Sequence, residues 1–237
     1  MARLNLVILF VGMAMLASTA SAATLDEIEK ACSDKWEAIT SASYDCTFDT
    51  NMSGQGFSMK SNGSAKGEMM HKGAKWLMRM DTKTSMVQTV GGNETKSDTS
   101  TTMVCDSDFL YTVSDTAGQK SGIKSKADTW TKMAGGKGFF QYLRDSSDLT
   151  VLPDGTVDGK SVYVVEAKAK QAGANVTRYY FDKDSGFALQ SVTNGADGKP
   201  MSTMKVSNLK QNVSLADDHF IFKAPEGVQI QDMTKQE

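Results

Sequence analysis

The side chains that could do chemistry are few and far apart in this sequence. His71 and His219 are its two histidines, and neither has a second metal ligand or a nucleophile at a useful spacing. Residues 182–186, DKDSG, open like a calcium-binding loop, but position 12 of such a loop would be Thr193, where a bidentate glutamate is required. We therefore expect a hairpin at 182–186, and no catalytic residues, metal site or cofactor.

The charge balance excludes partners that require a strong electrostatic field. The 26 basic and 28 acidic residues are well mixed and leave a net charge of −2. Nucleic-acid binding needs a basic stripe, which this pattern does not provide. The 15 methionines are unusually many, and methionine fills irregular apolar spaces or lines surfaces that accept variable partners. Some of them are therefore candidates to line a cavity.

Residues 1–22 have the pattern of a secretory signal peptide. Arg3 gives a positive start, residues 4–17 are almost wholly apolar, and residues 20–22, ASA, offer a small-residue cleavage site. We expect the mature chain to begin at Ala23 and residues 23–237 to form one domain. Its expected location is the periplasm, or outside the cell if the source has no outer membrane.

The cysteines do not define a disulfide framework. Cys32, Cys46 and Cys105 are an odd number, and a chain of this length can bury a core without cross-links. Two interpretations stay open. One is a Cys32–Cys46 disulfide, which an oxidising compartment would permit, and the other is buried free thiols.

The first predicted element is an amphipathic helix at 24–39. Thr24 and Glu27 have the spacing of a capping box. Apolar residues then recur at helical spacing along one stripe. These are Leu25, Ile28, Cys32, Trp36 and Ile39. Such a stripe needs an apolar surface to lie on.

Most of the remaining chain alternates between apolar and polar residues, as half-buried strands do. Strands are expected at 41–50, 57–70, 75–81, 84–90, 99–105, 108–114, 162–169, 176–182, 187–192, 201–209 and 219–222. Each connection between strands is short, so the sheet is predicted to be antiparallel. About ten or eleven strands with an N-terminal helix and a mid-chain helical segment predict a mainly β (α+β) fold, an incomplete antiparallel β-barrel.

Residues 126–149 interrupt the alternation. Two short helical turns around a hinge at Gly135, Gly136 and Gly138 are predicted there. The segment either plugs the open sheet permanently or forms a lid over a cavity for an apolar ligand. The candidates to face such a cavity are Trp130, Met133, Phe139, Phe140 and Leu143 from this segment, with Trp36, Trp76, Met78, Met80, Phe109 and Tyr111 from the helix and strands.

Motifs along the whole mature chain resemble those of the LolA-type periplasmic carriers and the wider outer-membrane lipoprotein-sorting proteins. Residues 220–232, FIFKAPEGVQIQD, are similar to that family's F-x-F-x-x-P-x-G-V-x-v-x-D ending. Residues 178–192 resemble its late hairpin. Residues 67–72 with Trp76 resemble its G-x-l-w-v-k strand and turn, and residues 105–111 its s-D-G-x-x-l-w-x-Y strand pair.

This resemblance implies a helical lid over an apolar cavity that takes the acyl chains of lipoproteins or another lipid. It also implies exchange with transfer proteins of the inner and outer membranes, no covalent chemistry, and a monomer. One departure stands out: the carriers place an Arg after the lysine of the strand-and-turn motif, where it helps to latch the lid, but here Lys72 precedes Gly73.

Two other functions stay open. One is a periplasmic lipid-sensing or regulatory module, similar to those that bind a membrane-anchored anti-sigma factor. The other is a structural envelope protein with a filled barrel.

Overall fold

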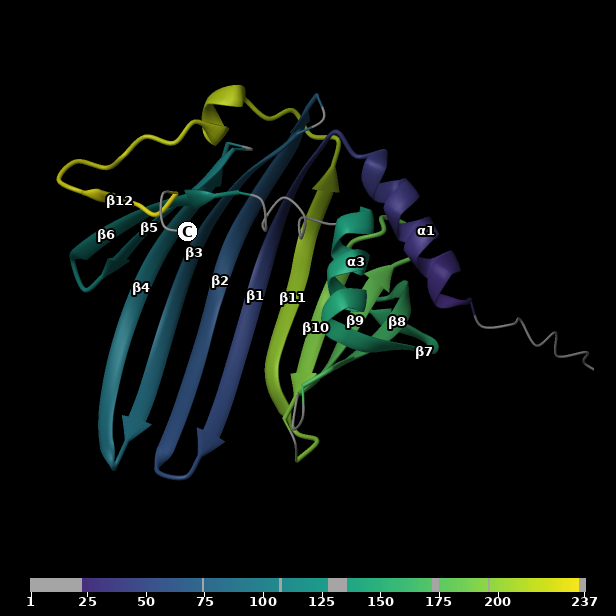
Figure 1. Ribbon diagram of the computed structural model, residues 1–237, viewed down its shortest axis with the longest axis horizontal. Coiled ribbons are helices and arrows are strands. Elements are labelled where there is room, and N and C mark those ends of the chain that lie inside the picture. The colour runs from purple at the N-terminus through teal and green to yellow at the C-terminus, as the bar shows by residue number, and fades with distance from the viewer. Residues whose placement is uncertain are drawn as a thin grey trace, which may run out of the picture.

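The computed structural model describes residues 23–73, 75–106, 108–127, 136–171, 175–195 and 197–234. These residues form one twelve-stranded sheet with two α-helices and a short 3-10 helix (Figure 1). The elements are α1 (Leu25–Glu37), β1 (Ser41–Gly54), β2 (Phe57–Lys72), β3 (Lys75–Val90), β4 (Asn93–Cys105), β5 (Phe109–Thr116), β6 (Gln119–Lys126), α3 (Gly136–Ser146), β7 (Ser147–Val157), β8 (Lys160–Ala169), β9 (Val176–Asp182), β10 (Ala188–Asn194), β11 (Pro200–Gln211), η1 (Asp217–Phe220) and β12 (Ile230–Asp232).

The predicted fold class, a mainly β protein with an unclosed sheet, is confirmed. The strands follow the order β12-β6-β5-β4-β3-β2-β1-β11-β10-β9-β8-β7, so β12 and β7 are the edges. Neighbouring strands are antiparallel, as predicted, except that β12 runs parallel to β6. The sheet has twelve strands where ten or eleven were expected.

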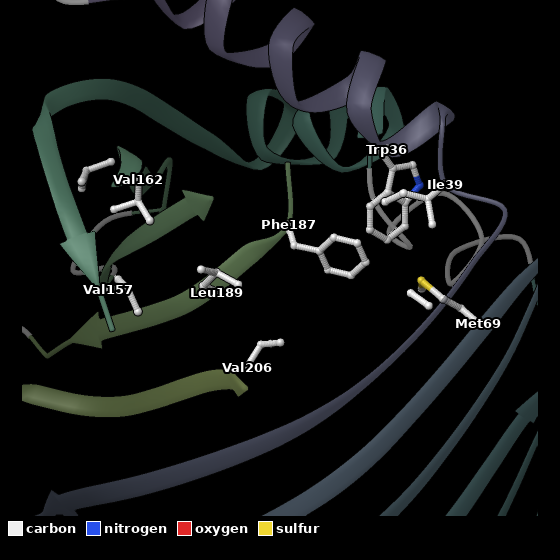
Figure 2. Packing of buried hydrophobic residues seen from close by; sticks show 10 residues of the cluster. Trp36, Ile39, Met69, Val157, Val162, Phe187, Leu189 and Val206 are labelled. Atoms are coloured by element: carbon white, nitrogen blue, oxygen red, sulfur yellow. The ribbon is translucent and has the colours of Figure 1, made fainter. Parts of the chain in front are cut away.

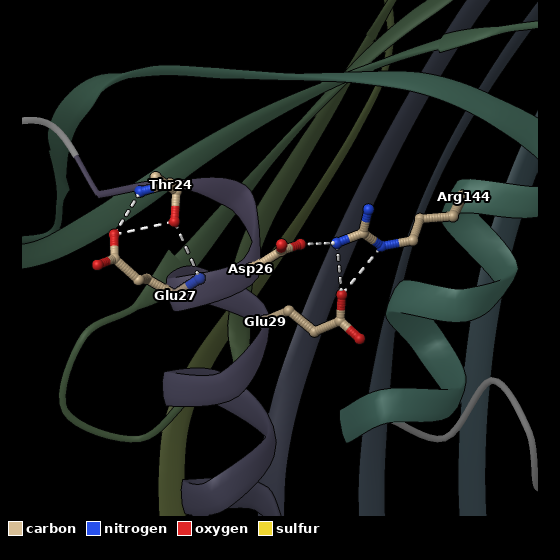
Figure 3. Close-up of polar contacts among 5 residues, drawn as sticks. All are labelled: Thr24, Asp26, Glu27, Glu29 and Arg144. Atoms are coloured by element: carbon tan, nitrogen blue, oxygen red, sulfur yellow. Dashed lines mark hydrogen bonds and ion pairs between the residues drawn. The ribbon is translucent and has the colours of Figure 1, made fainter.

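Helix α1 begins as its sequence predicts. The Thr24 hydroxyl accepts a hydrogen bond from the Glu27 amide at 3.3 Å, and the Glu27 carboxylate accepts one from the Thr24 amide at 2.7 Å (Figure 3). This capping box satisfies two backbone donors that the first helical turn leaves without partners. The helix then buries Ile28, Cys32 and Trp36 from the predicted stripe.

Several predicted elements differ from the structure. Residues 75–81 and 84–90 belong to one continuous strand, β3, and the predicted strand at 219–222 contains instead the end of η1. Strand β7 was not among the expected strands, and it contains Pro153 and Gly155. They lie at a bulge of an edge strand, where a proline removes no sheet hydrogen bond. In the predicted helical segment 126–149, the described residues after Gly135 contain one helix, α3, and the turn expected before the hinge lies outside the described residues.

Two buried clusters hold the helices to the sheet. The first joins the end of α1 to strands on both sides of the β1–β11 pairing (Figure 2). It consists of Trp36, Ile39, Ala42, Met69, Val157, Val162, Val164, Phe187, Leu189 and Val206. The second, between α1, α3 and strands β8–β9, consists of Ile28, Cys32, Phe140, Leu143, Val165 and Phe181. Neighbouring residues of β8 belong to different clusters, so this strand is buried on both faces.

In the part of the chain that the structure describes, no helix combines the length and apolar character needed to cross a membrane.

Candidate functional site

One face of the sheet lacks charged side chains across seven neighbouring strands. Because antiparallel partners share a face, the register of β1–β6 and β11 sorts their residues into two sets. We call one set the charge-free face, since in these described strands it contains no Asp, Glu, Lys or Arg. Its central residues are Cys46, Phe48 and Thr50 of β1, Ala65, Gly67 and Met69 of β2, Trp76, Met78, Met80, Thr82 and Thr84 of β3, Thr99, Thr101 and Met103 of β4, Leu110, Thr112, Ser114 and Thr116 of β5, Ile123 of β6, and Ser202, Met204 and Val206 of β11.

The opposite set carries the charges of these strands, and we call it the charged face. Partners on it include Glu68 opposite Arg79, Lys66 opposite Asp81, and Lys83 opposite Ser100. The chain has 54 charged residues, so a charge-free surface of this extent does not follow from composition. An aqueous surface would not need it, whereas contact with an apolar ligand would.

The charge-free face is partly open to solvent. Three of its large apolar side chains are exposed: Ile123 by 44%, Met204 by 37% and Val90 by 52%. These three side chains lie on β6, on β11 and at the end of β3, so they are exposed at separate places on the face.

Hydroxyl groups on this face bond to one another across strands. Thr99 and Thr116 lie 2.9 Å apart at their Oγ1 atoms, and Thr101 Oγ1 lies 3.1 Å from Ser114 Oγ. Thr50 and Ser202 form a third such pair at 3.1 Å. Covering a hydroxyl that already has a partner costs less than covering one that loses its bond to water.

Two glycines of β2 let aromatic rings lie flat on this face. Gly67 pairs with Tyr44 and Gly63 with Phe48, and at each glycine a Cβ atom would overlap the ring of its partner. The rings therefore occupy the space above the β2 backbone. Burial raises the pKa of Tyr44 to about 12, so its hydroxyl stays protonated.

Helices α1 and α3 cover one end of the sheet. Phe140 is 1% exposed and stacks on Phe181 with ring centroids 4.9 Å apart, while Phe139 meets Tyr179 edge-on at 5.5 Å. At the end of α1, the ring centroids of Trp36 and Trp76 lie 5.4 Å apart. Directly beneath α3 the described side chains are packed against one another.

An arginine joins the two helices. Arg144 of α3 donates two hydrogen bonds to Glu29 of α1, at 3.0 and 2.8 Å, and one to Asp26 at 2.6 Å (Figure 3). A hollow of about 510 Å³ opens beside this contact, lined by charged and polar groups. Its walls are Asp26, Glu29, Lys30, Ser33, Asp34, Lys137 and Arg144.

The C-terminal arm, residues 212–234, lies against the charged face. Phe222 stacks on Tyr111 at 4.3 Å between centroids, and Lys72 forms an ion pair with Asp217 at 2.6 Å. The arm ends as β12, where Ile230 fills the space above Gly122 of β6. The helices and the arm thus contact opposite faces of the sheet.

The structure divides the sequence-predicted site residues into three groups. Trp76 and Met78 pack against the first cluster, which includes Trp36, and Met80 follows on the same face. Phe139, Phe140 and Leu143 lie in or against the second cluster. Phe109 and Tyr111 lie on the charged face, on the opposite side of the sheet from Trp76, Met78 and Met80. Trp130, Met133 and Gly135 lie outside the described residues, as does the expected signal peptide. Whether any of these side chains contacts lipid stays a prediction.

Gly136 and Gly138 of the predicted hinge are the first and third residues of α3. Gly136 has φ of +59°, a conformation that favours glycine, while Gly138 lies within the helix.

The cysteine alternatives are resolved in favour of thiols. Cys32 and Cys46 are buried and not bridged. Burial raises the pKa of Cys32 to about 12, so this thiol is not a nucleophile at neutral pH. In the described part of the chain, no group of three or more His, Cys, Asp or Glu side chains is arranged to hold a metal ion.

Several residues of the charge-free face were missed by sequence reasoning, among them Met103, Thr101 and Met204. The signal was available in the alternation of 99–105 and 201–209. It could be used only once the pairing register was known, because register decides which alternating set of one strand joins which set of the next.

Comparisons with known proteins found one curated relative and several solved structures of low similarity. No family model matches the chain. An uncharacterised protein of Methanocaldococcus jannaschii is 26% identical over 207 residues, which are 86% of this chain and 53% of that protein. The chain therefore spans about half the length of the curated relative it matches.

Among solved structures, the MucA/MucB complex of Pseudomonas aeruginosa includes a chain that is 13% identical, with a TM-score of 0.49, over 84% of this chain and 59% of that one. The lipoprotein LppX of Mycobacterium tuberculosis is 13% identical, with a TM-score of 0.45, over 81% and 99%. A Vibrio parahaemolyticus domain described as an outer membrane lipoprotein-sorting protein domain is also similar, at 10% identity and a TM-score of 0.35, over 82% and 94%. Similarities this low identify no family, and we argue function from the residues of this chain.

Proposed function

We propose that this protein is a non-enzymatic carrier that holds the acyl chains of a lipoprotein or another lipid against its charge-free face. The observation that carries this proposal is the segregation of charge: seven paired strands direct their charged residues to one face and keep the other free of them. The signal-peptide pattern supports action in the periplasm. There the proposed carrier would act as a monomer and exchange lipid with partners at the inner and outer membranes.

The affinity would come from apolar burial. A fully buried methylene contributes about 0.8 kcal/mol, so ten methylenes half covered by the sheet contribute about 4 kcal/mol. Covering the paired hydroxyls of the face adds little cost. Segment 126–149, which includes α3, would complete the enclosure as a lid.

The proposal is tested first by native mass spectrometry of the protein purified from its own compartment, followed by lipid extraction. Binding is then measured with a long-chain fluorescent fatty acid. Met204→Asp places a charge on the exposed part of the charge-free face, and Thr203→Asp places the same charge on the charged face one residue away. We expect Met204→Asp to weaken binding at least tenfold, because a carboxylate would have to be desolvated, and Thr203→Asp to leave it unchanged.

The alternatives predict different results. A protein that binds no acyl probe but captures a membrane-protein partner without lipid would be a regulatory module. A protein that binds neither would fit the structural envelope role.

A further inference from the structure

The charge-free face changes character along its strands. Near the helices its cross-strand rows are apolar: Met69, Met78, Cys105 and Leu110 form one row, and Gly67, Met80, Met103 and Thr112 the next. Farther along the strands two rows consist mainly of hydroxyls. These are Ala65, Thr82, Thr101, Ser114 and Ser121, and then Gly63, Thr84, Thr99 and Thr116.

The hydroxyl rows form a compact polar block. Strands are about 4.8 Å apart and successive residues on one face about 7 Å apart, so the block over β3–β5 measures about 10 by 7 Å. Its side chains are half-buried, which leaves them within reach of a ligand. In each bonded pair, such as Thr101 with Ser114, one hydroxyl donates its hydrogen to the other. The second hydroxyl can then donate its hydrogen to a ligand, and both oxygens have lone pairs that can accept.

The block offers hydrogen bonds without charge. A phosphate or carboxylate headgroup would be bound by Arg, Lys or a helix N-terminus, and the described residues of the charge-free face provide no Arg or Lys. Sugar hydroxyls, by contrast, both donate and accept, and they match a surface of Thr and Ser side chains.

We infer that the preferred ligand is a neutral glycolipid, with its acyl chain along the methionine rows toward Trp76 and its sugar on the hydroxyl rows around Thr99 and Thr101. This inference rests on the proposed function and names the ligand class and orientation. The gradient from methionine to hydroxyl along one uncharged face is the arrangement that such an amphiphile requires.

The test compares three ligands of equal chain length below their critical micelle concentrations: an alkyl glucoside, the corresponding phosphatidylglycerol and the free fatty acid. The variant Thr99→Val/Thr101→Val removes two hydroxyls while keeping side-chain shape. Its matched control, Thr47→Val/Thr89→Val, makes the same changes on the charged face. Urea unfolding of each variant shows whether the sheet is intact.

We expect the wild type to bind the glucoside most tightly, and the Thr99/Thr101 variant to lose about tenfold in glucoside affinity while its fatty-acid affinity is unchanged. The control should retain the wild-type order. Equal binding of glucoside and phosphatidylglycerol, or an equal loss for all three ligands in the Thr99/Thr101 variant, would overturn the inference and leave the proposed function standing. Binding of none of the three would overturn both.

Discussion

Arg144 donates two hydrogen bonds to one carboxylate oxygen of Glu29, Oε2, from Nε at 3.0 Å and from Nη2 at 2.8 Å. The two residues belong to helices from distant parts of the sequence, and Asp26 accepts a further bond from Nη2. Three charge-assisted hydrogen bonds from one guanidinium to two carboxylates of α1 restrict how α3 lies on α1. Gly73 stands where the resembling carriers have the arginine that helps to latch the lid. In this protein Arg144 instead connects the two helices α3 and α1.

Replacing Arg144 by Gln should speed the exchange of bound lipid. The contact is partly exposed, so its loss should lower the free energy of unfolding by only about 1 kcal/mol, while α3 detaches from α1 more often. Stopped-flow displacement of the fluorescent fatty acid measures the exchange rate. Lys30→Gln, which removes an exposed pair within α1 alone, is the control. An unchanged rate in Arg144→Gln would show that α3 does not gate exchange.

Gly136→Ala should destabilise the protein by about 1–2 kcal/mol. The residue has φ of +59°, and a Cβ there would lie 3.0 Å from Trp36 Cδ1, so both backbone and packing resist the change. Gly138→Ala, inside α3, should instead be neutral or stabilise by up to about 1 kcal/mol, because alanine favours helix. Thermal unfolding of the two variants gives the comparison, and equal shifts would contradict the role assigned to Gly136.

Gly67→Ala should cost about 2–3 kcal/mol. An added methyl would overlap the Tyr44 ring, which must leave its place above the β2 backbone. Gly54→Ala, near the end of β1, meets nothing within 4 Å and should change stability by less than about 0.5 kcal/mol. Urea midpoints measure both. A tolerated Gly67→Ala would mean that the ring position is not fixed by the glycine.

Because of Asp182, the free energy of unfolding should decrease as the pH falls into the acid range. Burial alone would raise its pKa, but hydrogen bonds from Ser185 at 2.7 Å and Lys160 at 3.1 Å outweigh burial, and the net shift is downward. A carboxyl whose pKa is lower in the folded state stabilises the fold above its unfolded pKa, about 3.9, and this contribution is lost as the pH falls through the folded value.

Asp182→Asn should therefore lower the free energy of unfolding by about 2 kcal/mol at pH 7, because Ser185 and the half-exposed Lys160 lose their ionised partner. The difference from wild type should shrink between pH 4 and pH 2. Denaturant titrations at several pH values follow it. A difference that stays constant down to pH 2 would show that the charge of Asp182 does not contribute.

Local signals in the sequence predicted much of this fold. The capping box at Thr24 and Glu27 placed α1, and alternation correctly put Trp76, Met78 and Met80 on one face. Continuity of strands was harder to predict. A glycine inside a strand, such as Gly63 of β2, weakens the strand pattern, but here the Phe48 ring of the neighbouring strand β1 covers it.

The candidate site was predicted less completely, because it depends on pairing between strands. Phe109 and Tyr111 alternate correctly in their strand, yet only the register shows that they share the charged face with Arg79. The hydroxyl pair of Thr101 and Ser114 likewise joins two strands. Alternation defines two sets of residues in each strand, and tertiary pairing decides which sets meet.

The sheet order divides the polypeptide into two meanders, β1–β6 and β7–β11, each built from strands adjacent in sequence. In the described sheet, the pairing of β1 with β11 is the one strand contact between them, with Ala42 opposite Gln211 and Thr50 opposite Ser202. Hairpins within each meander close short loops, whereas the pairing of β1 with β11 closes a loop of about 160 residues. We therefore expect the hairpins to form first and this pairing to form after them. Separately produced halves of the chain would thus have one defined edge along which to recombine, and the surface proposed to bind lipid would be completed only when they do.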